Sequence, residues 1–238
     1  MERISVIAIG AHPDDVEILC AGTLAKYARL GHKIAICYAT DGQFGHVIIK
    51  PDELKEVRRG EAERSCSVIG AEMIWLGYQD EFIFDDKETR LRFIEAIRKV
   101  RANLIITHDP NDYHEDHRIV SRLATTAGFL ASVPNIETES PPLDWIPPVY
   151  YMDTLAGIGF LPTDYVDITE DIETKLKMLS CHESQVKWLM EHDGVDILDF
   201  VRTVNKFRGL QAGVAYAEGF RRHEAWGRMS ISMERLLP

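Results

Sequence analysis

Histidine and aspartate side chains, which can bind metal ions and transfer protons, gather in two short segments of the sequence. The first segment is GAHPDD at residues 10–15, and the second is DYHEDH at residues 112–117. Two adjacent carboxylates repel each other, so a fold that keeps them close usually supplies a cation, a helix cap or a shared proton. The chemistry of the first segment depends on which of these three the fold supplies.

Together the two segments offer enough nitrogen and oxygen ligands for a metal site. A catalytic zinc ion needs three protein ligands and one open position for water, and two histidines with one carboxylate meet that need. Neighbouring aspartates point in different directions, so one of them can bind the metal while the other faces the bound water. The candidate residues are His12, Asp14, Asp15, His114, Asp116 and His117.

Alternating strand-like and helical patterns predict an α/β fold that would bring the two segments together. Strands are expected at 4–10, 33–40, 72–78, 103–108 and 149–152, and helices at 15–30, 52–70, 88–101 and 118–131. This order is typical of a Rossmann-like, doubly wound and mostly parallel sheet with helices on both faces. With strand order 3-2-1-4-5, the first and fourth strands are neighbours, and ligands bind beyond their carboxyl ends. The two segments follow these two strands.

The rest of the chain is expected to belong to the same domain. Five prolines at 133–148 predict an irregular surface loop, and helical patterns follow at 170–190 and 194–213. The pattern at 215–226 does not indicate a helix or a strand. A chain of 238 residues is long enough for one sizeable α/β domain and too short for two, so we expect a single domain over 1–238.

The composition excludes several classes of protein. A net charge of -11, without a basic cluster interleaved with aromatic residues, argues against nucleic acid as a partner. The apolar stretch near the N-terminus is too short to span a membrane, which predicts a cytoplasmic protein with no integral membrane association. The four cysteines are widely separated and form no C-x-x-C pair, so we expect core thiols rather than disulfides or a cysteine zinc site.

Other interpretations of the two segments remain open at this point. An aspartate before a helix is more often a cap, and a lone histidine in a polar loop is usually solvated. A metal-dependent phosphohydrolase could use the same residues, although it would usually want more carboxylates for a second metal. A non-catalytic Rossmann-like ligand-binding protein is a further alternative, but the first turn lacks the G-x-G-x-x-G fingerprint. The adjacency of both segments favours a catalytic metal site.

The motifs AHPDD and HEDH resemble the signature of the LmbE-like, or PIG-L-like, family of zinc-dependent N-acetylglucosamine deacetylases. The pieces AGTLA, ATDGQFG, RRGEA, YQDE and YAEGF follow in the order that the family has. The resemblance implies one zinc ion per chain, and hydrolysis of an N-acetyl group on a small amino sugar or glycoconjugate by a zinc-bound water. It also implies a homo-oligomer, and it places most of the variation among family members at 133–148 and 165–238.

The resemblance assigns the central residues to roles in a zinc site. It implies that the zinc ligands are His12, Asp15 and His117, and that Asp14 is the general base. The adjacent aspartates would then divide into one ligand and one base.

The resemblance also assigns roles to residues around this centre. It implies that a protonated His114 stabilises the oxyanion or protonates the leaving amine, with Asp116 as its partner. It implies that Arg58 and Asp80 contact the sugar, and that His182 shapes the pocket.

Overall fold

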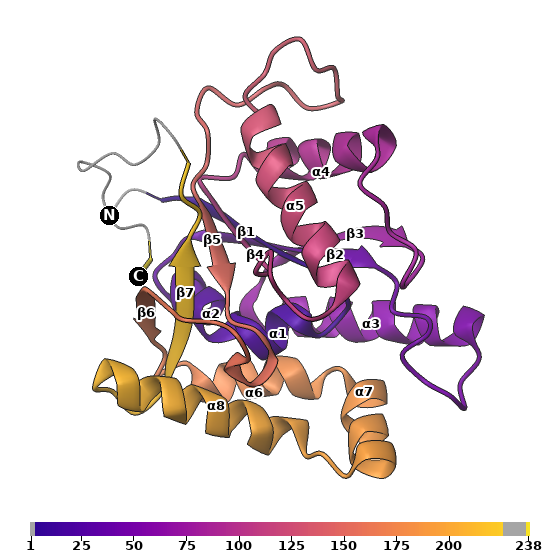
Figure 1. Ribbon diagram of the computed structural model, residues 1–238, viewed down its shortest axis with the longest axis vertical. Coiled ribbons are helices and arrows are strands. Elements are labelled where there is room, and N and C mark those ends of the chain that lie inside the picture. Colours follow the sequence, from indigo (N-terminus) through magenta and orange to yellow (C-terminus); the bar gives the residue numbers. More distant parts are fainter. Residues whose placement is uncertain (1–2, 226–236) are drawn as a thin grey trace.

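A seven-stranded sheet runs through the part of the chain that the computed structural model describes, residues 3–225 and 237–238 (Figure 1). The strands are β1 (Ser5–Gly10), β2 (Lys33–Thr40), β3 (Glu72–Tyr78), β4 (Leu104–Thr107), β5 (Val149–Met152), β6 (Asp164–Asp167) and β7 (Ala217–Arg222). Their order is β3-β2-β1-β4-β5-β7-β6, and β1 to β5 are parallel. The predicted order 3-2-1-4-5 is therefore confirmed, within a single α/β domain.

Helices cover both faces of the sheet (Figure 1). They are α1 (Asp15–Leu19), α2 (Ala21–Arg29), α3 (Pro51–Ile69), α4 (Lys87–Lys99), α5 (Glu115–Leu130), α6 (Ile172–Ser180), α7 (Glu183–Trp188) and α8 (Ile197–Ala212), with short 3-10 and π turns at Leu155–Gly157 and Leu189–Asp193. Every residue of β1 is buried. Val6 and Ala8 join the core under α2, α3 and α6, whereas Ile7 and Ile9 join the core under α4 and α5. Two-sided burial explains why β1 is a continuous apolar run.

Two predicted helices are each divided by a glutamate from a distant part of the chain. The helix expected at 15–30 is broken at Cys20, because Glu218 of β7 accepts hydrogen bonds from the backbone N–H groups of Gly22 and Thr23 at 2.9 and 2.7 Å. The helix expected at 170–190 ends at Ser180. It restarts as α7, whose Ser184 N–H donates to Glu61 at 2.7 Å. Each glutamate fills the role of a cap at a helix N-terminus.

The C-terminal part of the chain extends the sheet with two antiparallel strands that the sequence pattern did not predict. β7 pairs with both β5 and β6. The loop at 133–148 contains neither helix nor strand, as predicted. Buried Arg98 of α4 holds this loop by donating to the carbonyl oxygens of Val133 and Ile136. Part of the C-terminal region, residues 226–236, lies outside the described residues.

Two further predictions concern the cysteines and the membrane. All four cysteines are free thiols. Cys20, Cys37 and Cys66 are buried, as expected of core thiols, whereas Cys181 is only partly buried. Among the helices of residues 3–225 and 237–238, none combines the length and the apolar character needed to span a bilayer.

A buried ion pair lies beneath the junction of α1 and α2. Lys175 of α6 places its Nζ atom 2.5 Å from Glu218 Oε1, and neither side chain has any exposed area. The same carboxylate accepts the two α2 amides, so one glutamate joins the N-terminal helices, α6 and β7. Removing one partner of such a pair leaves an uncompensated charge in the core.

We expect Lys175→Met to lower the free energy of unfolding by about 3–5 kcal/mol, because it strands the Glu218 carboxylate in the core. Urea denaturation followed by circular dichroism measures this change. Lys177→Met, at an exposed position of the same helix, is the matched control and should change stability by less than about 0.5 kcal/mol. Equal stability of the two variants would contradict the role given to this ion pair.

Candidate active site

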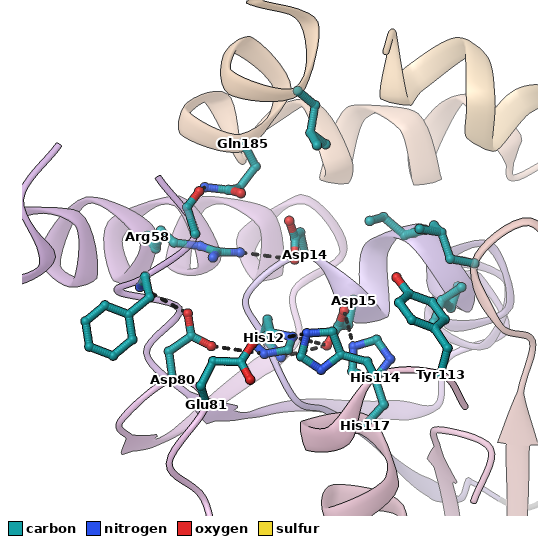
Figure 2. A pocket seen from close by; sticks show the side chains of 16 residues that line it. His12, Asp14, Asp15, Arg58, Asp80, Glu81, Tyr113, His114, His117 and Gln185 are labelled. Atoms are coloured by element: carbon teal, nitrogen blue, oxygen red, sulfur yellow. Dashed lines mark hydrogen bonds and ion pairs between the residues drawn. The ribbon is translucent and has the colours of Figure 1, made fainter. Parts of the chain in front are cut away.

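The carboxyl ends of β1 and β4 lie side by side and bring the two polar segments into one pocket. The strands pair in parallel, with Ile9 opposite Thr107, so the residues that follow each strand emerge at the same edge of the sheet. The pocket has a volume of about 400 Å³. The residues that line it from the two segments are His12, Asp14, Asp15, Tyr113, His114 and His117 (Figure 2).

Asp14 has a backbone conformation that directs the two adjacent carboxylates to different partners. Its φ of 129° lies in a region that residues other than glycine rarely adopt. Asp14 Oδ1 lies 3.1 Å from Arg58 Nη2, and the same guanidinium donates to the carbonyl oxygen of Pro13. Asp15 Oδ2, in contrast, accepts a hydrogen bond from the backbone N–H of His12 at 2.6 Å. The aspartate pair is thus divided between an arginine and a cluster of histidines.

The Asp15 carboxylate is surrounded by imidazole rings. Its oxygens lie 3.3 Å from His12 Nδ1, 3.3 Å from His117 Nε2 and 3.2 Å from His108 Nε2. His12, Asp15 and His117 each offer one ligand atom, and these atoms lie within 4.8 Å of one another. His108 Nε2 already accepts a hydrogen bond from the Ala11 backbone N–H at 3.0 Å, so this ring supports the cluster.

The other ring nitrogens of His12 and His117 face further carboxylates. His12 Nε2 lies 3.1 Å from Asp80 Oδ1 and 3.3 Å from Asp116 Oδ2, and His117 Nδ1 lies 3.2 Å from Asp112 Oδ2. In metal sites, a carboxylate behind the second nitrogen orients the ring and raises its basicity. The nitrogens that face Asp15 are therefore available to a metal ion.

The charge of Asp15 favours the protonated form of the two imidazoles beside it. Although burial opposes the shift, the charge of Asp15 raises the pKa of His117 to about 9 and raises that of His12 well above its ordinary value. Burial acts to raise the pKa of Asp15, but the charges of His117 and His12 hold it well below its ordinary value. A carboxylate that keeps two protonated imidazoles beside it fits a site built for a cation.

Asp14 lies in a different electrostatic environment. Burial raises the pKa of this carboxyl to about 6, and the charge of Arg58 limits the rise. Arg58 itself is buried on α3 and donates from Nη1 to the carbonyl oxygen of Gly42 at 3.0 Å. A Cβ atom at position 42 would overlap the Arg58 guanidinium. The φ of Gly42, 62°, also favours glycine. The loop after β2 can therefore lie directly against Arg58.

The structure places some predicted residues differently from the expectation. Asp116 does not contact His114 and lies against His12, because side chains two positions apart at the start of a helix do not face each other. His114 Nε2 lies 3.3 Å from Glu81 Oε1 instead. Burial and the charge of His12 lower the pKa of His114, which favours the neutral form of its ring.

The residues predicted to contact the sugar or to shape the pocket differ in their access to it. Arg58 and Asp80 line it. His182 is fully buried, is not part of the lining, and has its Nε2 atom 3.4 Å from Glu17 Oε1. Gln185, one turn further along, reaches the pocket in its place.

The sequence analysis missed two supporting residues. His108 ends the fourth predicted strand and stacks on His117 with ring centroids 3.9 Å apart. Asp112 opens the second segment and lies behind His117. The position of His108 at the carboxyl end of β4 was the signal that could have identified it, because the other site residues were found by that rule.

A doubly wound sheet with a buried His/Asp cluster where the strand order reverses defines the LmbE-like class of α/β enzymes. Residues 7–128 match the family model described as PIG-L: GlcNAc-PI de-N-acetylase. The chain belongs to this family of deacetylases.

Relatives of known function cover most of the chain. The diacetylchitobiose deacetylase of Thermococcus kodakarensis is 30% identical over 91% of this chain and 82% of that protein. The solved N,N'-diacetylchitobiose deacetylase from Pyrococcus horikoshii has a TM-score of 0.81 and 29% identity, covering 93% of this chain and 84% of that one. A 4-oxalmesaconate hydratase of Pseudomonas putida is 24% identical over 90% of this chain and 87% of that protein. The relatives therefore do not fix the substrate.

We expect Asp112→Asn to weaken metal binding about 10–100-fold, because His117 loses the carboxylate that orients its ring. Competition against a chelating dye, with Zn²⁺ as the probe, measures the affinity. Asn111→Ala changes the exposed neighbour and should leave the affinity unaltered. An Asp112→Asn protein with native affinity would show that this carboxylate does not support a ligand.

Proposed function

We propose that this protein is a zinc-dependent N-deacetylase that removes the acetyl group from an N-acetylglucosamine-type amino sugar or its conjugate. The main support is the arrangement of two imidazole rings. His12 and His117 both face Asp15, and each ring has a further carboxylate behind it. Two imidazoles and one carboxylate suit a catalytic zinc ion with an open position for water. Held by these three side chains, one ion per chain would polarise the amide carbonyl and lower the pKa of water to about 7.

Asp14 is proposed as the general base. Arg58 occupies its Oδ1 atom, and the other carboxylate oxygen is free to take the proton of the attacking water. A pKa of about 6 suits this task, because a base works best when its pKa is near the operating pH. The same oxygen can then return the proton to the leaving nitrogen. The second proton of the water is released as the new carboxyl group ionises and is taken up by the amine, which gives acetate and the protonated amine.

His114 is proposed to stabilise the negative charge that develops on the former carbonyl oxygen. Its ring lies in the pocket wall, and burial lowers its pKa, so we propose that the neutral ring donates one N–H to this oxygen. Asp116 then acts on His12 rather than on His114, since it lies 3.3 Å from His12 Nε2.

The charged lining favours a substrate with hydroxyl groups. Asp80 and Glu81 lie beside the cluster, and carboxylates accept hydrogen bonds from sugar hydroxyls. A phosphate ester fits less well, because the lining combines four carboxylates with one arginine. The homo-oligomer and the cytoplasmic location stay predictions.

The purified protein is expected to contain about one zinc ion per chain, and a chelator should abolish acetate release from N-acetylated amino sugars. Elemental analysis and an acetate assay on the same sample measure both. His117→Ala should lose the metal, because two ligands remain. A full zinc content in that variant would overturn the ligand assignment.

Asp14→Asn is expected to keep its zinc and to lower kcat by roughly 10²–10⁴-fold, the usual cost of losing a general base. Steady-state kinetics and metal analysis test this together. Asp144→Asn, at an exposed site outside the pocket lining, serves as the control and should match the native rate. Native turnover by Asp14→Asn would mean that another group takes the proton.

A further inference from the structure

The pocket has a charged side, where Phe44 also lies next to Asp80, and an aliphatic side. Arg58, Asp80 and Glu81 lie together on one side of His12 (Figure 2). The lining also contains four aliphatic side chains, which we call the apolar wall: Ile18, Leu19, Leu155 and Leu189. Neither metal binding nor the proposed proton transfers use this wall.

The apolar wall begins at the reacting centre. Ile18 and Leu19 are three and four residues after Asp15 on α1, so they share its face of the helix at about 5–6 Å between Cβ atoms. Ile18 and Leu189 also pack against the core beneath, which fixes their positions. The apolar wall is therefore continuous with the cluster of His12, Asp15 and His117 and is not a separate groove.

The apolar wall also borders a second, smaller cavity. Ile18, Leu19 and Leu155 line both the pocket and this cavity, whose far side is formed by Phe200 and Val201 of α8. The cavity offers about 10 Å³, which is close to the space of one water molecule. Leu155 therefore lies between the pocket and the small cavity, which has no room for a ligand. An apolar group can bind only on the side of the apolar wall that faces the pocket.

The direction of the amide bond determines what the apolar wall contacts. The sugar hydroxyls need the charged side, and the amide nitrogen is attached to the sugar. The acyl carbon lies at the opposite end of the C–N bond. With the carbonyl at the Asp15 cluster, the acyl chain points away from Arg58 and Asp80, toward the apolar wall. A single acetyl methyl group covers only a small part of four aliphatic side chains.

We propose that the apolar wall is an acyl-chain subsite, and that the protein hydrolyses amino sugars whose N-acyl group is a linear chain longer than acetyl, such as propionyl or butyryl. The proposal rests on the proposed amide hydrolysis. Water is the sole co-reactant: its oxygen forms the new bond to the acyl carbon, the C–N bond breaks, and the nitrogen leaves as the protonated amine beside a carboxylate.

Binding of the product carboxylates tests the subsite without turnover. Calorimetry on the zinc-loaded protein compares acetate with butyrate, and burial of each additional methylene should tighten binding roughly four-fold. We therefore expect butyrate to bind about 15-fold more tightly than acetate. Equal affinities would overturn the subsite.

Turnover of N-acetyl-, N-propionyl- and N-butyryl-glucosamine, followed by amine release, tests the same inference with substrates. Leu155→Asn should lower the butyryl to acetyl ratio of kcat/KM about ten-fold, since a polar group replaces apolar contact area. Leu189→Asn should lower it in the same direction. Leu161→Asn, at a position 84% exposed and outside the lining, should leave the ratio unchanged.

The outcomes separate this inference from the proposed function. Cleavage of the acetyl amide alone, with equal binding of acetate and butyrate, would overturn the subsite and keep the deacetylase. Preference for butyrate without cleavage of any amide would keep the subsite and overturn the deacetylase. A parallel series of alkyl glycosides of N-acetylglucosamine covers the remaining alternative: if Leu155→Asn changed that series instead of the acyl series, the wall would bind the aglycone and our assignment would be wrong.

Discussion

The positive φ of Asp14 is the constraint on which the arrangement of the site depends. Two consecutive carboxylates can share one pocket because the backbone turns between them and gives each its own cationic partner. A residue held in this conformation costs on the order of 1–3 kcal/mol and persists only where its surroundings enforce it. Here Arg58 binds both the Pro13 carbonyl and the Asp14 carboxylate, while the Asp15 carboxylate accepts the His12 amide. The fold thus loses some stability in order to separate Asp14, the proposed base, from Asp15, the proposed ligand.

The same division sets the electrostatics of the pocket. Asp15 lies among imidazoles and stays ionised, whereas Asp14 has one arginine and a raised pKa. Neighbouring residues of the same type therefore differ in proton affinity because of what surrounds them. Pairs of titratable groups whose pKa values are pushed apart in this way are typical of acid–base catalysis.

The sequence was sufficient to predict what depends on local pattern and on strand order. The five parallel strands, their order and the meeting of His12 with His117 all follow from alternating apolar runs and the rule for the carboxyl ends of a sheet. It was insufficient where a distant residue decides a local structure. The break at Cys20 depends on Glu218, almost the whole chain away, and the role of His108 depends on its stacking against His117. The strands β6 and β7 were not predicted, because neither has the continuous apolar run that marks β4 and β5.

The contact between Glu218 and the start of α2 has a consequence for how the chain reaches its native state. The proposed metal ligands lie between residues 12 and 117, so a ribosome releases all of them well before β7 emerges. Until Glu218 arrives, the amides of Gly22 and Thr23 and the ammonium of Lys175 have no buried partner. The segment that carries the proposed site residues His12, Asp14 and Asp15 therefore gains this support only after a long loop has closed. Formation of the centre is thereby coupled to completion of the sheet.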